Sequence, residues 1–434
     1  MFARAKLAGL AAALSGVFIT AACPAHAAAC SGKSVRITFA NWASAEAATA
    51  KEVNAAIAAF EQANPCVRIA SIAIPYNNVV SQLTVMTVGH NTPDVMQLSS
   101  GMPQLLAAQG ALADLSHYAS QAFLNDNYSA MLRDGQFAGR QVALPFALTP
   151  HGFWFNKALL AKAGLDPARP PQTIAALDQA MAAIKAKLPG IYPFGIMDDK
   201  APYTVVVMWP WLQAFCKTVP MSDKHLGWTQ PCVEKAFSWF AMLAKKGYTP
   251  IGNDIKDNRQ LFATDKMVFE VDGPYLRGII SSISPQYAPD SAFADTFGAE
   301  AIPAGPAGPS RTAIDIHLIA MSAHSADPQA AWKFIHFMIA NPASVGDFLI
   351  PQGTIPPLKS SQAAFANQLD QPYQKVWVQS IIPEAEPIPY NPKWYRASND
   401  IIDALQGVMD NAPVKASLDR LEASLKQVYP DFQP

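Results

Sequence analysis

The stretch of sequence that decides the fold is 145-PFALTPHGFWFNKALLAKAGLDPARPPQT-173. It begins with the pattern of a buried strand and continues into a short helix over 157–163. Gly164 ends this helix, because a residue without Cβ tolerates the left-handed backbone of a C-terminal cap. Thr173 then supplies a hydroxyl that caps the next helix. The stretch predicts a strand–helix unit between prolines, and it leaves open whether the aromatic run 153–155 forms a binding site or a core.

Strands alternate with helices in the part of the chain that precedes this stretch. Apolar runs predict three strands, at 35–40, 67–74 and 94–98. Amphipathic segments predict helices between them, at 53–60 and 79–88. This alternation is typical of a parallel α/β sheet with right-handed crossovers, in which ligands lie beyond the carboxyl ends of the strands. Those ends carry our first candidate ligand-binding residues: Trp42, Tyr76, Ser99 and Ser100.

The length and composition predict a folded protein of two domains. The chain has 434 residues, of which 50% are apolar, and a single core seldom grows beyond roughly 250–300 residues. The charged fraction of 15% is too low for a disordered chain. The net charge of −1 gives no attraction to nucleic acid or to an anionic membrane surface, so we expect neither as a partner.

The first 27 residues have the features of a signal peptide. Two basic residues precede an apolar, alanine-rich run over 7–22, and Ala25-His26-Ala27 fits the pattern of a cleavage site. Cys23 offers an alternative, because 19-ITAAC-23 is close to the motif at which bacteria attach a lipid. No later segment has about eighteen uncharged apolar residues in a row. We therefore expect a periplasmic protein, with lipid anchoring at Cys23 as the alternative.

Four cysteines remain after either kind of processing, and export makes disulfides possible. Cys30 and Cys66 each lie just before a predicted strand, so two neighbouring parallel strands would bring them together. We therefore predict a Cys30–Cys66 disulfide and, by elimination, a Cys216–Cys232 disulfide. Four separate buried thiols are the alternative. The absence of a CxxC motif argues against a zinc ribbon or a thioredoxin-like redox site.

Enzyme and metal-site motifs are missing from the sequence. It has no GxSxG, HExxH, P-loop or GxGxxG motif, and its histidines show no metal-ligand spacing. The acidic pairs Asp198-Asp199 and Glu384/Glu386 could act as general acid and base, but such pairs are more often solvated loop charges. We expect no catalytic residue, no metal and no cofactor.

Aromatic residues at predicted loops and strand ends are the remaining candidates for a binding site. A sugar has apolar C–H faces and polar edges, so its site needs flat rings beside carboxylates, amides and hydroxyls. The candidate rings are Trp42, Tyr76, Trp209, Trp211, Tyr275 and Trp394. Each alone is more often a core residue. Trp42 and Tyr275 are favoured because each follows a strand. Trp209-Pro210-Trp211 lacks a clear periodic pattern, which favours a loop that presents two rings.

Four motifs, in this order along the chain, resemble the large extracellular solute-binding proteins of ABC importers, the sugar-type family 1 that includes maltose- and glycerol-3-phosphate-binding proteins. They are 152-GFWFNKALLAKAGLDPARPPQT-173, 272-DGPYL-276, 302-IPAGP-306 and 328-PQAAWKFIHFMI-339. The resemblance covers essentially the whole chain after residue 27. It implies an α/β, two-lobed periplasmic-binding-protein fold of type II. Each lobe would be a mainly parallel sheet flanked by helices, and hinges would link the lobes.

The resemblance also implies where the chain crosses between the lobes. The crossings would lie near 145–150, 302–308 and 351–357. The N-terminal lobe would then consist of residues 28–146 and 306–350, and the C-terminal lobe of residues 147–305 and 351–434. The aromatic run 153–155 would begin the sheet of the second lobe, so most of its rings would be core. Ligand contacts in this stretch would then be Thr149 and His151.

Within the family, the segment 146–166 most resembles the glycerol-3-phosphate-binding branch, but the match is partial. Tyr76, Thr149 and Arg396 fall at ligand positions of that branch. Ser100 and Thr354 replace a glutamate and a tyrosine, and Ile314-Asp315 replaces a Gly-Gly pair. The carboxylate of Asp315 would repel a phosphate and would suit sugar hydroxyls. The ligand could therefore be a neutral sugar, a polyol or a glycerophosphodiester, and Arg396 could instead form a surface salt bridge.

We therefore expect a periplasmic solute-binding protein that captures a carbohydrate or glycerol-phosphate-type ligand between its lobes. The expected partners are this small molecule and the subunits of an ABC permease, and we expect the protein itself to be a monomer. One alternative is a secreted carbohydrate-active hydrolase, which would need two carboxylates about 5–10 Å apart across a cleft. The other is a sensor that presents the ligand to a receptor.

Overall fold

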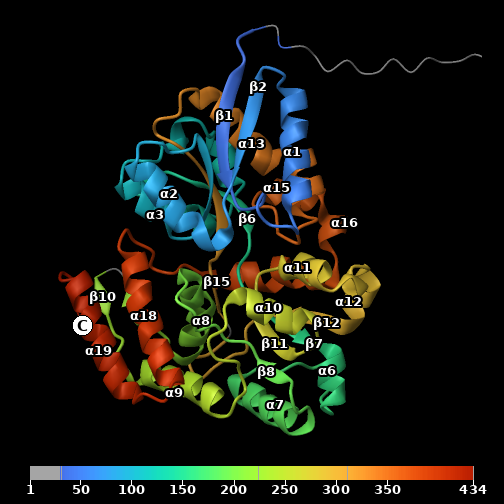
Figure 1. The fold of residues 1–434 in the computed structure, drawn as a ribbon, viewed down its shortest axis with the longest axis vertical. Helices are drawn as coiled ribbons and strands as arrows, with labels where there is room; N and C mark the ends of the chain where they lie inside the picture. The colour runs from blue at the N-terminus through green and yellow to red at the C-terminus, as the bar shows by residue number, and fades with distance from the viewer. Residues whose placement is uncertain (1–29, 31, 223, 310, 434) are drawn as a thin grey trace, which may run out of the picture.

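The structure is a computed structural model that describes Cys30 and residues 32–222, 224–309 and 311–433. The signal peptide expected over 1–27 and the alternative lipid site at Cys23 lie outside the described residues. The chain forms two α/β lobes, which Figure 1 shows one above the other.

The first lobe is built on a five-stranded sheet with the strand order β2-β1-β3-β14-β6. Its strands are β1 (Val35–Asn41), β2 (Val67–Ala73), β3 (Val95–Ser99), β6 (Leu144–Leu148) and β14 (Ile316–Met321). The main helices packed around the sheet are α1 (Ala50–Ala63), α2 (Val79–Val88), α3 (Met102–Ala108), α5 (Ser129–Asp134) and α13 (Pro328–Ala340). The alternation of strands and helices predicted for the first hundred residues is confirmed.

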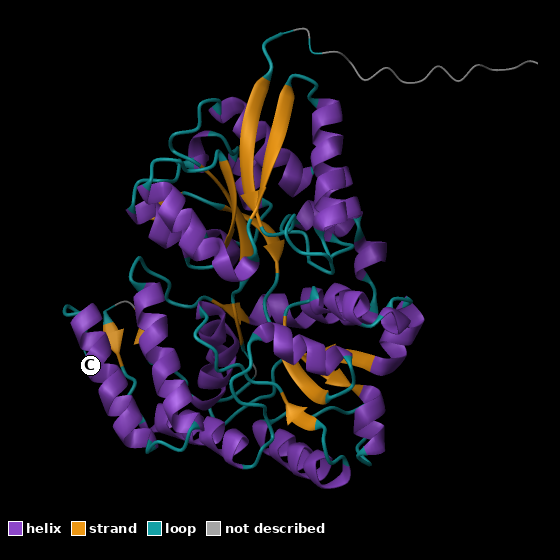
Figure 2. Cartoon of the chain, in the orientation of Figure 1, coloured by secondary structure: helices purple, strands orange, loops and turns teal. Residues whose placement is uncertain are grey.

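The second lobe is built on a four-stranded sheet with the order β12-β7-β11-β8. Its strands are β7 (Gly152–Asn156), β8 (Tyr192–Phe194), β11 (Met267–Asp272) and β12 (Phe297–Glu300). Figure 2 shows that helices make up most of the rest of this lobe. They are α6 (Lys157–Lys162), α7 (Ile174–Lys187), α8 (Pro202–Phe215), α9 (Pro231–Lys245), α10 (Ile255–Ala263), α11 (Leu276–Ile283), α12 (Asp290–Thr296), α17 (Pro372–Val376), α18 (Trp394–Met409) and α19 (Val414–Val428).

Both sheets are mixed, because one strand in each runs against its neighbours. In the first lobe β14 is antiparallel to β3 and β6, whereas β1 is parallel to β2 and β3. In the second lobe β7 is antiparallel to β11 and β12, whereas β11 is parallel to β8. β7 is the strand by which the chain enters the second lobe, and β14 is the strand by which it returns to the first. The expectation of mainly parallel sheets therefore holds for the strand directions, since all strands but one in each sheet run the same way, but neither sheet is wholly parallel.

The aromatic run 153–155 lies in β7 and belongs to the core of the second lobe. All three rings are buried, and Phe153 stacks on Phe269 with ring centroids 5.0 Å apart. Gly164 has a φ of 77° after the end of α6, as its predicted role in the helix cap requires. The Thr173 hydroxyl accepts a hydrogen bond from the N–H of Ala176 and caps α7. The interpretation of this stretch as a scaffold is therefore correct.

The first crossing between the lobes lies where it was expected, between β6 and β7. The expected second crossing at 302–308 is wrong, because this segment still packs on the second lobe. The N–H of Ala304 donates to the carbonyl of Gln172, and the N–H of Ala307 donates to the carbonyl of Ala214. The chain reaches the first sheet only after β13 (Thr312–Ala313), at 314–315. The Pro/Gly segment marks turns rather than the lobe boundary.

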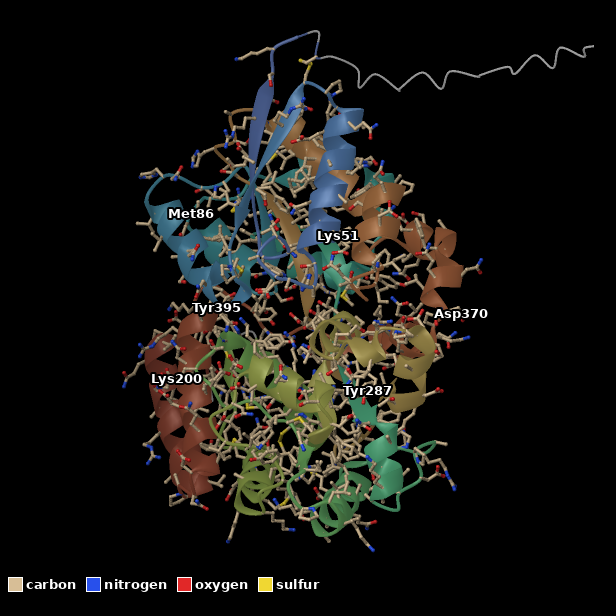
Figure 3. All side chains as sticks on the ribbon, turned by 45° about the vertical axis from the view of Figure 1, so that its right-hand side comes forward. Lys51, Met86, Lys200, Tyr287, Asp370 and Tyr395 are labelled. Atoms are coloured by element: carbon tan, nitrogen blue, oxygen red, sulfur yellow. A yellow bond between two sulfur atoms is a disulfide. The ribbon has the colours of Figure 1, made fainter. Side chains whose placement is uncertain are left out.

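The expected third crossing at 351–357 is also placed too early. After this segment the chain forms α15 (Lys359–Ala364) and α16 (Ala366–Leu369). The N–H of Lys359 donates to the carbonyl of Asp126, and the Tyr128 hydroxyl bonds Gln362, so this part packs on the first lobe. Figure 3 shows Asp370 at the boundary between the lobes. Residues 351–369 therefore belong with the first lobe, and the C-terminal helices of the second lobe begin after them.

Both predicted disulfides are present, Cys30–Cys66 and Cys216–Cys232. The first joins the starts of β1 and β2, whose parallel register pairs Val35 with Val67. The second links the end of α8 to the first turn of α9. The reasoning from neighbouring strand starts is therefore confirmed.

Candidate ligand-binding cleft

Two adjoining cavities lie between the lobes. The first cavity has a volume of about 360 Å³ and the second about 270 Å³. They share three lining residues: Tyr76, Asn77 and Tyr203. Tyr76 comes from the first lobe and Tyr203 from the second, and their rings meet edge to face with centroids 5.8 Å apart. This aromatic contact between the lobes lies where the two cavities meet.

The first lobe supplies an aromatic wall to the first cavity. Trp42 and Tyr76 follow β1 and β2, whose parallel pairing brings the two strand ends together.

 The Trp42 ring meets the rings of Tyr76 and His317 edge to face, with ring centroids 5.4 Å and 4.8 Å apart. His317 lies on β14, where burial lowers its pKa to about 4, so the imidazole is neutral at physiological pH. Such edge-to-face packing holds the rings in place before a ligand arrives.

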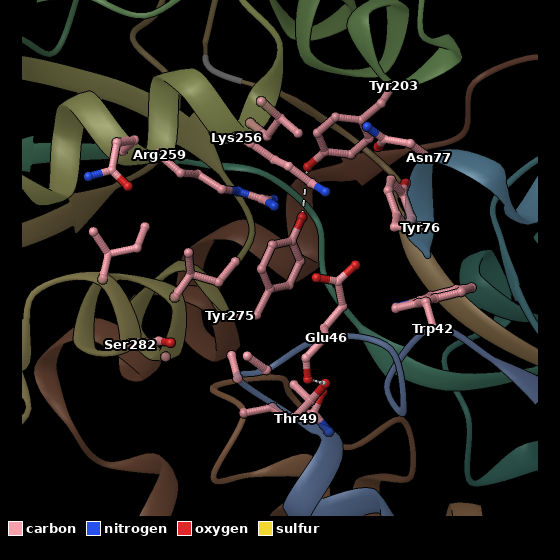
Figure 4. A pocket seen from close by; sticks show the side chains of 18 of the residues that line it. Trp42, Glu46, Thr49, Tyr76, Asn77, Tyr203, Lys256, Arg259, Tyr275 and Ser282 are labelled. Carbon is pink, nitrogen blue, oxygen red and sulfur yellow. Dashed lines mark hydrogen bonds between the residues drawn. The ribbon is translucent and has the colours of Figure 1, made fainter. Parts of the chain in front are cut away.

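The second lobe supplies a buried ion pair to the same cavity. Arg259 of α10 donates to both carboxylate oxygens of Asp272, with Nε–Oδ2 at 2.6 Å and Nη2–Oδ1 at 3.0 Å. Burial alone would raise the pKa of Asp272, but the guanidinium lowers it below its ordinary value. The guanidinium carbon also lies 5.3 Å from the ring centre of Tyr275. Figure 4 shows Arg259, Tyr275 and Glu46 of the first lobe pointing toward the middle of the cavity.

Tyr203 connects this cavity to the hinge. Its hydroxyl oxygen lies 2.7 Å from that of Tyr275, 3.2 Å from Oδ1 of Asp272 and 2.8 Å from Nε2 of His151. The same Nε2 lies 3.4 Å from Oδ2 of Asp315. His151 belongs to the first crossing and Asp315 to the second, so polar contacts run from the cavity to both crossing segments.

The second cavity also combines polar and aromatic side chains. Its lining includes Ser99, Ser100, Asp315, Tyr390, Trp394, Tyr395 and Asn399. The Ser100 hydroxyl donates to Oδ2 of Asp134 at 2.6 Å and accepts from the N–H of Ile316 at 3.1 Å. Burial raises the pKa of Asp134 to about 7, and the Ser100 hydrogen bond only partly opposes this shift. Tyr395 lies at the boundary between the lobes (Figure 3).

Seven of the twelve predicted ligand-binding residues line the two cavities: Trp42, Tyr76, Ser99, Ser100, Tyr275, Asp315 and Trp394. Thr149 and His151 are buried behind the cavities at the first crossing, where the Thr149 hydroxyl donates to the carbonyl of Asp315. Arg396 lines neither cavity. Its side chain is 69% exposed and lies 3.9 Å from Asp400, which fits the alternative of a surface salt bridge.

The expected loop at Trp209-Pro210-Trp211 is wrong, because these residues lie inside α8. Both indole rings are fully buried, and Trp209 packs against Trp228 and Trp394. The helix is buried on all sides from 203 to 214, so no polar face remains to give it a periodic pattern. These two rings are core residues rather than a binding platform.

Sequence reasoning missed several residues that line the first cavity, above all Glu46, Tyr203, Arg259 and His317. His317 carried a usable signal, because it is a polar residue inside the apolar strand 316–321. Arg259 carried none, because a single arginine on a polar helix is ordinary. Its importance comes from Asp272, which reaches it from a different element.

The structure offers no metal centre in the part of the chain that it describes. Among the described residues, no group of three or more His, Cys, Asp or Glu side chains could hold a metal ion. In the same residues, no helix is both long enough and apolar enough to cross a membrane.

Solved structures of similar fold come from several bacteria. The GacH receptor of Streptomyces glaucescens, studied unliganded and with acarbose, aligns with a TM-score of 0.81 at 18% identity, over 93% of this chain and 100% of its own. A solute-binding protein of Thermotoga lettingae bound with α-D-tagatose gives 0.81 at 17% identity, covering 92% and 100%. Maltose-bound MalE3 of T. maritima gives 0.80 at 20% identity, covering 91% and 100%. These likenesses establish the two-lobed fold.

Sequence comparison identifies the family. Proteins of Brucella abortus and Brucella suis that are named as binding proteins are 23% identical to this chain over 406 residues, covering 91% of it and 93% of their own length. The model of the family described as bacterial extracellular solute-binding proteins matches residues 55–375, well over half of the chain. This is a family of binding proteins rather than enzymes. The chain therefore belongs to the bacterial extracellular solute-binding proteins.

Proposed function

We propose that this protein captures a neutral carbohydrate or polyol in the cleft between its lobes and delivers it to the permease of an ABC importer. The observation that carries the proposal is a cavity in which aromatic rings from both lobes meet polar side chains. Trp42 and Tyr76 come from the first lobe, and Tyr203 and Tyr275 from the second. Aromatic rings cover the apolar faces of a sugar, and the polar groups among them bond its hydroxyls.

The charges around the cavities favour a neutral ligand over a phosphate. Asp315 gives the second cavity an acidic group, and in the first cavity the charges of Glu46 and Lys256 oppose each other. The Arg259 guanidinium is already paired with Asp272 and is therefore a weak attractor for a further anion. The resemblance to glycerol-3-phosphate-binding proteins is thus a poor guide to the ligand. The solved neighbours bound with α-D-tagatose and maltose point the same way.

Ligand binding would favour the closed arrangement of the lobes, because the ligand contacts both lobes only when they are closed. The closed form is then the state that a permease distinguishes from the empty protein. Such a role places the protein in the periplasm, in agreement with the signal peptide expected from the sequence. Recognition by permease subunits requires no covalent chemistry.

The test is the thermal unfolding of the mature protein with a panel of sugars, polyols and glycerophosphodiesters. A ligand at 100 times its dissociation constant should stabilise the fold by about 2.7 kcal/mol. Stabilisation by a sugar or polyol supports the proposal. Stabilisation by a glycerophosphodiester alone would contradict the neutral ligand, and hydrolysis of a panel member would indicate an enzyme.

Tyr275→Ala locates the site. This change should abolish the ligand-induced shift while leaving the unfolding temperature of the empty protein nearly unchanged. Tyr118→Ala is the control, because Tyr118 is also half-buried but lines neither cavity. An undiminished shift in Tyr275→Ala would place the ligand elsewhere.

A further inference from the structure

We propose that Tyr275 offers the ligand an acceptor oxygen and no donor, beside the Arg259 guanidinium, so that this end of the first cavity selects a ligand hydroxyl. The inference rests on the proposed function and names the ligand group that this part of the site recognises. Tyr203 and His151 act as positioning residues, because their hydrogen bonds determine the direction of the Tyr275 hydroxyl.

The ring of His151 is fully buried. Its Nε2 contacts the Tyr203 hydroxyl at 2.8 Å and Oδ2 of Asp315 at 3.4 Å, whereas its Nδ1 has no hydrogen-bond partner among the described residues. A carboxylate oxygen only accepts hydrogen bonds, so the contact with Asp315 is favourable only if Nε2 carries a proton. Nε2–H therefore donates to Tyr203, and the Tyr203 oxygen accepts.

Tyr203 must then use its own proton elsewhere. Its two remaining neighbours are Oδ1 of Asp272 at 3.2 Å and the Tyr275 oxygen at 2.7 Å. A hydrogen bond to the carboxylate is the stronger choice, because the acceptor is charged. Donation to Tyr275 would instead leave the Tyr203 oxygen facing the carboxylate without a proton between them. Tyr203 therefore donates to Asp272.

Tyr275 is then the donor in its short contact with Tyr203 (Figure 4). Burial, together with the charge of Asp272, raises the pKa of Tyr275 well above its ordinary value, so the side chain stays a neutral phenol. A phenol has one proton, and here Tyr203 takes it. The lone pairs of the Tyr275 oxygen are what remains for a ligand in the first cavity.

Arg259 completes the recognition of a hydroxyl. A guanidinium has five N–H donors, of which Asp272 takes one on Nε and one on Nη2. The remaining donors and the Tyr275 oxygen together match a group that both accepts and donates, as a hydroxyl does. A carboxylate or an ether oxygen would place an acceptor against an acceptor at Tyr275. An ammonium group would be repelled by the guanidinium.

The first experiment tests the hydrogen-bond directions without any ligand, by nitrogen-15 NMR of the histidine side chains in the whole mature protein. His151→Gln assigns the signal of His151 by its disappearance. If that variant does not fold, Tyr203→Phe assigns the signal by shifting it. We expect a proton on Nε2 of His151. A bare Nε2 would draw the Tyr203 proton away from Asp272 and would overturn the inference.

The second experiment compares maltose and D-tagatose with their monofluoro analogues, in which fluorine replaces one hydroxyl at a time. Fluorine cannot donate, so replacement of the hydroxyl that faces Tyr275 should weaken binding to the natural protein about 10- to 100-fold. Tyr275→Phe removes the acceptor, and Tyr203→Phe frees the Tyr275 proton to point at the ligand. Both variants should reduce that loss to a few-fold.

Tyr128→Phe is the matched control, because it removes a tyrosine hydroxyl bonded to Gln362 away from the cavities. It should keep the full loss. An equal loss on fluorination in the natural protein, Tyr203→Phe and Tyr275→Phe would overturn the inference. If the natural protein binds neither maltose nor D-tagatose, the proposed function fails for these two sugars. The NMR experiment still decides the directions of the hydrogen bonds.

Discussion

The ion pair between Arg259 and Asp272 gives the most direct test of the energetics of the cleft. Asp272 is fully buried and the Arg259 side chain is 16% exposed. Two unit charges about 4 Å apart attract each other by roughly 4 kcal/mol at an effective dielectric constant of about 20. Asp272→Asn keeps the shape of the side chain but leaves the guanidinium buried without a counter-charge. We expect the free energy of unfolding to fall by about 3–5 kcal/mol.

The assay is a double-mutant cycle at pH 7, with urea unfolding followed by tryptophan fluorescence. Arg259→Met should destabilise by a similar amount, because it leaves the carboxylate buried and unpaired. The double variant should lose much less than the sum of the two single losses, because it buries no unpaired charge. Asp419→Asn breaks an exposed ion pair with Lys415 and should change stability by about 0–1 kcal/mol.

The pH dependence follows from the lowered pKa of Asp272. A carboxyl whose pKa is lowered by folding stabilises the protein above its unfolded-state pKa, here near 3.8, and loses this contribution as the pH falls through its folded-state pKa. The advantage of the natural protein over Asp272→Asn should therefore be complete above about pH 5 and shrink below about pH 4. Additive losses in the cycle, or a stable Asp272→Asn at pH 7, would refute the reasoning.

Three further changes test the rest of the fold. Replacing Cys216 and Cys232 by Ser removes a disulfide of sequence separation 16 and should lower the free energy of unfolding by about 3 kcal/mol. The same change at Cys30 and Cys66, with a separation of 36, should lower it by about 4 kcal/mol, as measured by unfolding midpoints. Asp134 should weaken the fold as the pH rises from about 4 to its folded-state pKa of about 7, because over this range its carboxyl ionises in the unfolded chain but stays protonated in the fold. Asp134→Asn should remove this pH dependence from a series of unfolding curves, and an unchanged slope would count against it. Trp211→Ala should lower the free energy of unfolding by about 3–5 kcal/mol, since the ring is fully buried; lost sugar binding with unchanged stability would return Trp211 to the site.

The local patterns of the sequence were reliable where one face of an element meets water or where a turn needs a special backbone. The period of the apolar residues located α1 and α2 to within a few residues. The positions of Gly164 and Thr173 correctly predicted a helix end and a helix start. These features depend on neighbours only a few residues away, so the chain specifies them locally.

The same patterns failed where burial removes the contrast between faces. The helix α8 is apolar and buried on nearly all sides, so Trp209-Pro210-Trp211 had no periodic pattern from which to recognise it. The Pro/Gly segment 302–308 marked a turn, but the sheet that a segment joins depends on hydrogen bonds to distant residues. Turn residues therefore predict where the chain bends and not the lobe to which it belongs.

The sequence by itself determined the succession of strands and helices, the pairing of the cysteines and the strand ends at which Trp42, Tyr76 and Tyr275 lie. Only the tertiary structure decided which of the candidate residues share a cavity. It paired Arg259 with Asp272, and it placed Tyr203 between the cavity and His151. The physical reason is that strand ends follow from local patterns, whereas the direction of a hydrogen bond depends on every partner that folding brings within reach.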